Sequence, residues 1–483
     1  MMSHEYDAVI IGSGPNGLAA AITMAMAELS VLVLEAKDTI GGGMRSAELT
    51  EPGFIHDICS AVHPLAAASP FLRRLPLEKH GLQWIYPPIA AAHPLENADT
   101  AALKQSIQTT AKALGEDREA YIRIFEPLVN DWEKIASDIL GPLRIPYYIP
   151  EALRFGLKAI QSADSFVGRY FSNEKARALF AGMAAHSMLP LDKAITSAIA
   201  LVLMIQGHSH GWPIPKGGSQ SIANAMESMI LSLGGKIERN IKLESPGEIP
   251  SSKAVLFDLT PKQILKIYND ALPDRYRRQL SKYRYGPGTF KIDWALSEAI
   301  PFKAEECREA GTLHVGGSFE EIAKSEEQVW HGIAPEKPYI ILVQPSLFDS
   351  TRAPEGRHTA WAYCHLPNGS ETDMTDRIQD QIERFAPGFK DTIIAKHTIS
   401  PAAFESYNPN YIGGDINGGV QDLGQLFFRP VPSLSPYRMP LKGHYICSSS
   451  TPPGGGVHGM CGYHAARRAL KDIFDIHFDI SKT

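Results

Sequence analysis

A short apolar segment that runs directly into a glycine turn constrains the fold of this chain more than any other feature. Residues 6–11 read YDAVII, which is typical of a buried parallel strand, and a GxGxxG pattern begins at Gly12 without a spacer. In such a pattern Gly12 forms a tight turn, Gly14 lets the backbone approach a pyrophosphate, and Gly17 allows a helix to pack closely on the strand. We therefore expect a helix over residues 16–28 whose N-terminus faces the phosphates of a dinucleotide.

An acidic residue after the next apolar segment narrows the choice of dinucleotide. Residues 30–34 predict a second strand, and Glu35 follows it, 18 positions after Gly17. A carboxylate at about this distance binds the adenosine ribose hydroxyls in such folds, and it would repel a 2′-phosphate. NADP is therefore disfavoured, which leaves FAD or NAD.

A second run of glycines favours FAD over NAD. Gly41, Gly42 and Gly43 follow the acidic residue closely, and Met44 and Arg45 come next. Clustered glycines let the backbone pass close to a long buried cofactor, and Arg45 could supply a cation to its pyrophosphate or ring. We therefore predict that the chain binds FAD.

The segment that begins with these glycines, GGGMRSAELTEPGFIHDICSAVHPL, resembles the start of the phytoene desaturase-like FAD-dependent oxidoreductases, and in particular a subgroup akin to the pyridine nucleotide-disulphide oxidoreductase domain proteins. In carotenoid desaturases an arginine often follows the glycine pair directly, whereas here Gly43 holds that position and Arg45 comes two residues later. The resemblance implies an α/β chain with a discontinuous Rossmann-like FAD-binding domain of the glutathione reductase and amine oxidase type. It also implies an inserted substrate domain that combines a mixed sheet with helices.

The pattern of the remaining chain suits this division. Apolar residues at helical spacing dominate residues 101–205, and strand-like runs at 289–296, 339–343 and 358–364 alternate with helices. We expect residues 1–75, 206–270 and 410–483 to form the FAD-binding domain, and residues 76–205 and 271–409 to form the substrate domain.

A unit in the middle of the chain marks the return to the FAD-binding domain. Two glycine pairs flank an amphipathic helix that ends near Leu233, and a strand-like segment follows at residues 236–243. The resemblance implies that this unit rejoins the FAD-binding domain and that Leu243 lies beside the adenine.

A second glycine turn lies near the end of the chain. Residues 444–449 predict a last strand, the glycines at 454, 456 and 459 again satisfy GxGxxG, and a helix is expected over residues 460–470. Only 24 residues follow Gly459, too few for a separate nucleotide-binding unit of about 30 residues or more. The turn is therefore interpreted as a second loop-to-helix junction that faces the same cofactor, with amides that stabilise negative charge on the flavin. The resemblance places the turn at the isoalloxazine ring.

These arguments define a set of predicted site residues. The predicted cofactor-binding residues are Gly12, Gly14, Pro15, Asn16, Gly17, Glu35, Ala36, Gly42, Gly43, Met44, Arg45, Leu243, Gly456, Val457, His458, Gly459 and Met460. The candidate catalytic residues are His458, which the motif would place near the ring, and Tyr463, with a structural role as the alternative for each.

Other polar residues are weaker candidates. Lys216 could act as the lysine that many flavin amine oxidases hold near the flavin, although nothing local marks it. His208 and His210 lack a third ligand at metal-site spacing, so no metal site is predicted. The resemblance places four further residues near the flavin or substrate: Asp57, His63, Tyr363 and His365.

Composition limits the class of partner and the compartment. A formal charge of −6 and a pI near 6.3 provide no basic surface for nucleic acid. Five cysteines without a CxxC pattern suit free thiols in a reducing compartment, and the first five residues contain no secretory leader. The apolar stretch at 194–205 is shorter than the ~20 residues of a membrane-spanning helix. A cytoplasmic enzyme is expected, and peripheral contact with lipid stays open.

The predicted function is an FAD-dependent dehydrogenase or desaturase that acts on a mostly apolar small molecule, isoprenoid or lipid-like, with oxygen or a quinone as candidate electron acceptors. A flavin-dependent double-bond isomerase and an amine oxidase are alternative enzymes. A non-enzyme alternative is a carrier of prenylated proteins, because fold alone does not establish redox activity. The intact glycine motifs weigh against that carrier.

Overall fold

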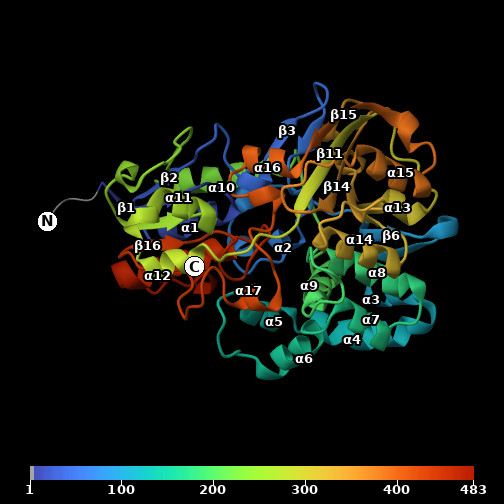
Figure 1. Ribbon diagram of the computed structural model, residues 1–483, viewed down its shortest axis with the longest axis horizontal. Helices are drawn as coiled ribbons and strands as arrows, with labels where there is room; N and C mark the ends of the chain where they lie inside the picture. The colour runs from blue at the N-terminus through green and yellow to red at the C-terminus, as the bar shows by residue number, and fades with distance from the viewer. Residues whose placement is uncertain (1–4, 483) are drawn as a thin grey trace.

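Two large β-sheets, each with its own helices, dominate the structure, and four short strands form two further two-stranded sheets (Figure 1). The computed structural model describes residues 5–482, so residues 1–4, which belong to the segment expected to hold no leader, lie outside the described residues. The first sheet has five parallel strands in the order β16-β10-β1-β2-β9. They are β1 (Tyr6–Ile11), β2 (Val31–Leu34), β9 (Lys236–Glu238), β10 (Ser252–Phe257) and β16 (His444–Ile446). This sheet is Rossmann-like and its strands come from distant parts of the chain, as predicted.

Helices cover both faces of the parallel sheet. Alternate residues of β1 point to opposite faces, so Ala8 and Ile10 pack with one group of helices and Val9 and Ile11 with another. The first group contains α1 (Pro15–Met26), α10 (Gln220–Ser232) and α18 (Met460–Ala469), and the second contains α11 (Pro261–Tyr268) and α12 (Asp274–Leu280). Burial on both faces explains why β1 and β2 are continuous apolar runs in the sequence.

The second sheet has seven strands in the order β15-β11-β14-β13-β12-β6-β7. Adjacent strands of this sheet are antiparallel, except for β6 and β12, which are parallel. The strands are β6 (Ile89–Pro94), β7 (Thr100–Leu103), β11 (Gly288–Leu296), β12 (Ala310–Val315), β13 (Ile340–Val343), β14 (His358–Leu366) and β15 (Ile393–Ile399). Three strand-like runs of the sequence correspond to β11, β13 and β14. Helices α13 (Glu305–Glu309), α14 (Phe319–Trp330) and α15 (Thr375–Phe385) accompany this sheet.

The helical layer begins later than the sequence suggests. The prediction of mainly helical structure from residue 101 is wrong at its start, because β7 continues to Leu103 and pairs with β6. Both strands are rich in alanine, which favours helix by intrinsic propensity, but their residues are buried in the sheet. Tertiary pairing therefore overrides local propensity here.

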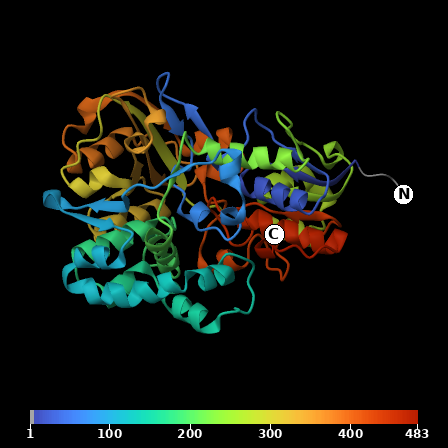
Figure 2. The same cartoon turned by 180° about the vertical axis from the view of Figure 1, so that it is seen from behind.

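The helical layer itself lies beneath the seven-stranded sheet, as the blue-green segments of Figure 2 show from behind. It consists of α3 (Ile107–Lys112), α4 (Arg118–Asn130), α5 (Trp132–Ile139), α6 (Ile149–Ala159), α7 (Ala163–Tyr170), α8 (Glu174–Ala185) and α9 (Thr196–Ser209). None of the described helices combines the length and apolar character needed to cross a membrane.

Short elements complete the chain and join the two parts. They are β3 (Ser46–Glu48), β4 (Ile55–Asp57), α2 (Pro64–Ala67), β5 (Trp84–Ile85), β8 (Ile214–Pro215), α16 (Pro401–Tyr407) and α17 (Leu423–Phe427). β9 and β16 are shorter than the predicted strands at 236–243 and 444–449, since the chain leaves both strands to line a cavity.

Candidate functional site

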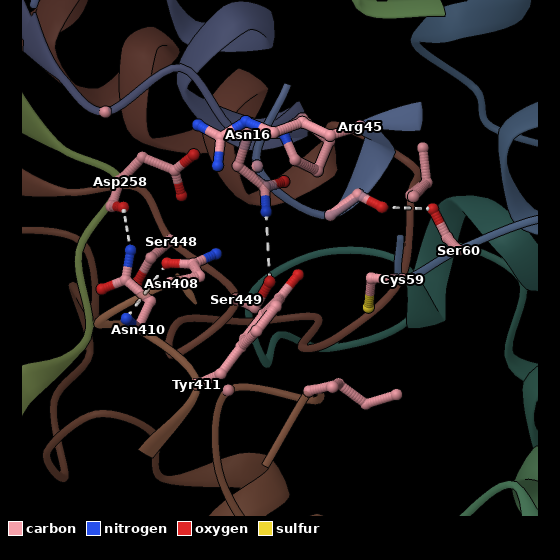
Figure 3. A pocket seen from close by; sticks show the side chains of 18 of the residues that line it. Asn16, Arg45, Cys59, Ser60, Asp258, Asn408, Asn410, Tyr411, Ser448 and Ser449 are labelled. Carbon is pink, nitrogen blue, oxygen red and sulfur yellow. Dashed lines mark hydrogen bonds between the residues drawn. The ribbon is translucent and has the colours of Figure 1, made fainter. Parts of the chain in front are cut away.

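A cavity of about 700 Å³ lies between the two sheets and is lined from both. Its walls include the loops at the carboxyl ends of β1, β2 and β10, the segment after β16, and residues of α9, β12, β13 and β14. Cavities outside the carboxyl ends of parallel strands are the usual ligand sites of open α/β sheets. Figure 3 shows several of its lining side chains.

The first glycine turn lies at one wall of this cavity. Gly12 has a φ of +96°, which glycine adopts without strain, and Gly14 provides the residue before helix α1. Gly12, Gly14, Pro15 and Asn16 line the cavity. Gly17 does not line it, because its Cα faces the turn: a Cβ there would collide with the carbonyl oxygen of Gly12. Close packing of α1 on β1 therefore requires this glycine.

Glu35 is held rigidly at the end of β2. Its carboxylate accepts hydrogen bonds from the amides of Ser13 and Lys37 at 3.0 and 2.9 Å, and it forms an ion pair with Arg45 at 3.1 Å. Glu35 and Arg45 are both buried, and Arg45 also donates to the carbonyl of Thr39. Both line the cavity. The carboxylate thus has a fixed orientation at the cavity wall, and its binding of the ribose stays a prediction.

The pairing of Arg45 with Glu35 adds a positioning role to the one predicted for the arginine. A guanidinium bound to a carboxylate at the end of β2 fixes the orientation of that carboxylate. Its cation also lies over the ring of Tyr407, at 5.6 Å from the centroid. The contact of Arg45 with the pyrophosphate or ring of the cofactor stays a prediction, since Arg45 also lines the cavity.

The second glycine run brings the chain close to the first. A Cβ on Gly42 would lie 3.0 Å from the Cα of Gly14, and one on Gly43 would lie 2.7 Å from the hydroxyl of Tyr411. Gly42 and Gly43 line the cavity, and Ser60 donates to the carbonyl of Gly43 at 2.8 Å, as Figure 3 shows. Met44 instead points into the hydrophobic core.

The segment after β9 closes the adenosine end of the cavity. Ile241 donates its amide to the carbonyl of Glu35 at 2.9 Å, so residues 241–244 run beside the ribose-binding acid. Leu243 and Ala36 line the cavity at this end. The contact of Leu243 with the adenine stays a prediction.

Only some residues of the C-terminal glycine turn line the cavity. Gly456 and Val457 line the cavity, and Gly456 has a φ of +121°. Gly459 precedes helix α18 and packs against α1, where a Cβ would lie 2.9 Å from that of Ala19. Met460 is buried in the core behind it. Gly459 and Met460 therefore support the turn from outside the cavity, which corrects their prediction as cofactor contacts.

The two candidate catalytic residues lie outside the cavity, which corrects that prediction also. His458 accepts a hydrogen bond from the amide of Met460 at 3.0 Å and so caps helix α18, and burial lowers its pKa to about 4. Tyr463 stacks on Phe71, and its hydroxyl accepts from the amide of Ile480 at 3.1 Å. Both side chains therefore serve packing and hydrogen bonding within the fold.

The weaker candidates divide between cavity and core. His63 and Tyr363 line the cavity, whereas Lys216 is exposed and does not. Asp57 pairs with Arg352 at 2.8 Å in a fully buried ion pair. His365 contacts Glu326, His208 contacts the Tyr121 hydroxyl, and His210 contacts Arg73.

Several lining residues carry no motif in the sequence. Asp258 follows β10, and the loop at 407–411 and the residues Ser448 and Ser449 also line the cavity, with Ser449 accepting from the side chain of Asn16 at 3.3 Å. Asp258 could have been found as the polar residue that ends a parallel strand, a position that faces ligands in such folds. The far wall contains Leu203, Trp212, Thr312, Ile341, Val343, Trp361 and Tyr363 with His186.

The cavity fits FAD by several observations. The cavity extends from the carboxylate of Glu35, past two glycine turns, to the C-terminal turn. A Cβ built on the glycines of these turns would collide with neighbouring atoms. The side-chain oxygen of Asn16 is buried at the first turn and has no hydrogen-bond partner among the described residues. A buried oxygen of this kind can accept a hydrogen bond from a ligand. The N-terminus of α1 carries the positive end of the helix dipole, which favours phosphates.

Comparisons with known proteins agree with this site. A family described as NAD(P)-binding Rossmann-like domain matches residues 10–75. Pyridine nucleotide-disulfide oxidoreductase domain-containing protein 2 of Mus musculus is 26% identical over 97% of this chain and 94% of its own length. The lycopene-forming phytoene desaturase of Pseudescherichia vulneris is 23% identical over 96% of this chain and 98% of its own length.

Solved structures share the fold. An oxidoreductase from Methanosarcina mazei superposes with a TM-score of 0.66 at 15% identity, covering 96% of this chain and all of that one. A triple mutant of putrescine oxidase has a TM-score of 0.63 at 17% identity, covering 97% and 99%. The chain is therefore an FAD-dependent oxidoreductase that is similar over nearly its whole length to a pyridine nucleotide-disulfide oxidoreductase domain protein and to a phytoene desaturase.

Proposed function

We propose that this oxidoreductase dehydrogenates a mostly apolar small molecule, isoprenoid or lipid-like. The observation that carries the proposal is the absence of formal charge on the far wall of the cavity. The lining residues from the helical layer and the seven-stranded sheet include no aspartate, glutamate, lysine or arginine among those the structure describes. Charged lining residues such as Glu35 and Asp258 come instead from the FAD-binding side.

The far wall favours an apolar substrate over a cationic amine. Leu203, Ile341, Val343 and Trp361 provide apolar and aromatic surface, which gains free energy when it contacts an apolar ligand. An ammonium group would find aromatic rings but no carboxylate to offset its loss of hydration. The name of the phytoene desaturase relative points in the same direction.

His186 is the proton acceptor on this wall in our proposal. Its Nε2 lies 2.8 Å from Nε2 of His314, and burial lowers the pKa of His186 to about 3. The imidazole is therefore neutral at physiological pH, which is the form that can accept a proton, and the same burial makes it a weak base. FAD, when bound, would supply hydride-accepting chemistry for one substrate carbon, and His186 would take the proton from the neighbouring carbon that joins the new double bond.

Anaerobic reduction of the purified holoenzyme tests this function. Isoprenoids, fatty acyl compounds and amines are each mixed with the enzyme, and bleaching of the flavin absorbance is followed with product analysis. Bleaching by apolar compounds that gain a double bond supports the proposal. Bleaching by amines alone supports an amine oxidase. A double-bond shift that occurs only after prior reduction of the flavin supports an isomerase. Purified protein that does not bind flavin would contradict all three functions.

We also propose that the enzyme meets its substrate at a lipid surface. Helix α6 and the segment before it expose an apolar stripe of Ile145, Ile149, Leu153, Leu157 and Ile160, and Ile145 is 84% exposed. Exposed apolar residues at helical spacing are typical of interfacial helices. The tyrosines at 147 and 148 and the cations of Arg144, Arg154 and Lys158 flank the stripe, as at the boundary between headgroups and acyl chains.

Flotation with phospholipid vesicles tests the lipid surface. We expect the enzyme to float with vesicles that contain anionic lipid, and the double variant L153E/L157E to lose this association while keeping its flavin. Leu231→Glu is the matched control, because Leu231 is 53% exposed on α10, away from the stripe. Vesicle binding that survives L153E/L157E, or self-association that this variant abolishes, would contradict the proposal.

A further inference from the structure

Asp258 places a carboxyl group at the point where a dinucleotide phosphate is expected. The residue follows β10, whose last residue Phe257 pairs with Ile11 just before the glycine turn. Its Oδ2 accepts a hydrogen bond from the amide of Gly17 at 2.9 Å, and a Cβ on Gly14 would collide with the same oxygen. The carboxyl thus occupies the space between Gly14 and Gly17 at the first turn of α1.

The surroundings disfavour a negative charge on this carboxyl. Asp258 is 8% exposed, and burial raises its pKa to about 7, although the amides of Gly17 and Gly14 act in the opposite direction. The negative charge of the Glu35 carboxylate raises the pKa of Asp258 further. Arg45, a cation that lines the same cavity, is already paired with Glu35.

The other groups that face Asp258 do not supply a compensating cation. The thiols of Cys447, after β16, and Cys461, on α18, are buried neighbours whose own pKa values are raised by burial. Asn410 donates at 3.3 Å to the backbone carbonyl of Asp258 rather than to its carboxyl group, as Figure 3 shows. Among the described residues, the amides of the glycine turn are therefore the donors to this carboxyl.

We propose that Asp258 is a pyrophosphate-binding residue that acts in its protonated form, so that FAD binding is coupled to the uptake of one proton. An ionised carboxylate would repel the negative pyrophosphate at the α1 N-terminus. A neutral carboxyl instead accepts from the amide of Gly17 with one oxygen and offers the O–H of the other as a donor to the phosphate. The residue then strengthens cofactor binding rather than opposing it.

The direction of the pH dependence follows from this coupling. Below about pH 7 the carboxyl is already protonated before FAD binds, so the dissociation constant changes little with pH. Above about pH 7 the flavin-free protein carries a charge that must be neutralised on binding. Linkage then raises the dissociation constant by up to about tenfold for each pH unit.

Dilution of the holoenzyme at a series of pH values tests the coupling. The fluorescence of released flavin gives the dissociation constant of FAD between pH 6 and 9, independently of catalytic activity. We expect the wild-type constant to be flat up to about pH 7 and to rise by more than tenfold by pH 9. A wild-type constant that does not change over this range overturns the proposal, and this measurement needs no variant to fold.

Asp258→Asn provides the matching variant. An amide oxygen can accept from Gly17, and the amide N–H mimics the donor of a protonated carboxyl without titrating. We expect D258N to retain FAD with a constant that is flat from pH 6 to 9 and more than tenfold lower than wild type at pH 9. A D258N slope equal to that of wild type overturns the assignment of the proton to Asp258.

Asp415→Asn is the control for this variant. Asp415 is also buried with a raised pKa, but it accepts from the amides of Gly286 and Gly419 and does not line the cavity. We expect D415N to keep the wild-type slope. A loss of the slope in D415N would place the coupled proton outside the glycine turn and contradict the proposal.

Discussion

The guanidinium of Arg45 pairs with the carboxylate of Glu35 at 3.1 Å, and both side chains are buried at the adenosine end of the cavity. The pair fixes the orientation of Glu35 before FAD arrives, because the carboxylate also accepts from the amides of Ser13 and Lys37. A preorganised acceptor loses less conformational entropy when it binds a ribose hydroxyl.

Replacing Glu35 by Ala is expected to weaken FAD binding about tenfold to a hundredfold. The change removes the ribose acceptor, which costs about 1–3 kcal/mol of binding free energy, and it also leaves Arg45 buried without its carboxylate partner. Equilibrium release of flavin on dilution measures the effect. Glu238→Gln is the control, since Glu238 is exposed on the neighbouring strand β9 and lies outside the cavity lining. Equal retention of FAD by E35A and wild type would refute the assignment.

Replacing Gly456 and Gly459 by Val is expected to have different consequences. At Gly456, φ is +121° and a Cβ would lie 2.8 Å from a methyl of Leu65, which lines the cavity. G456V should therefore shift the flavin absorbance spectrum and midpoint potential. G459V should chiefly lower the melting temperature, because a Cβ there meets Ala19 of α1. An unaltered spectrum in G456V would contradict this placement of the turn.

His458 is expected to affect stability rather than catalysis. Its pKa falls to about 4 in the folded protein, so the unfolded chain binds more protons between about pH 6.5 and 4. The contribution of neutral His458 to stability is present above pH 6.5 and is lost as pH falls toward 4. His458→Asn, whose side-chain oxygen can still cap α18, should flatten this fall by up to about 1.4 kcal/mol per pH unit in urea unfolding.

Dehydrogenation rates provide the contrasting measurement for His458. H458N should keep the rate of flavin reduction by substrate within about threefold of wild type. A large loss of rate with unchanged stability would restore His458 as a catalytic candidate.

Replacing His186 by Gln is expected to slow flavin reduction by about 10²–10⁴-fold, the range of a lost general base. Because its pKa lies near 3, the wild-type rate should show no ionisation of His186 between pH 5 and 8. Stopped-flow absorbance measures both. His331→Gln, at an exposed position after α14, is the control. A normal rate in H186Q would remove the histidine from the mechanism.

Sequence reasoning succeeded where function depends on residues close together in the chain. The strand, glycine turn, helix and acid between residues 6 and 35 form one local unit, so their spacing alone predicted the dinucleotide site and the fold class. The glycines at 42, 43 and 456 were likewise recognisable because a close backbone approach tolerates few other residues. Relatives of the chain confirm FAD as the cofactor.

The features that could not be predicted from the sequence depend on the direction of a side chain or on packing between distant segments. His458 follows the residues that line the cavity, yet the backbone turns its ring toward the amide of Met460. β6 and β7 look helical by composition, yet they pair with each other, and β6 also pairs with the distant strand β12. The pairing with β12 and the direction of the His458 ring are not encoded within a few residues of either position.

The amino-acid sequence by itself determined the cofactor class, because the chemistry that binds a dinucleotide is carried by a contiguous pattern of glycines and an acid. Only the tertiary structure decided which side chains meet in the cavity. Asp258 reaches Gly17 across 241 positions of the chain, and Arg45 forms an ion pair with Glu35. Such meetings depend on how strands from separated segments assemble side by side, which spacing within one segment does not specify.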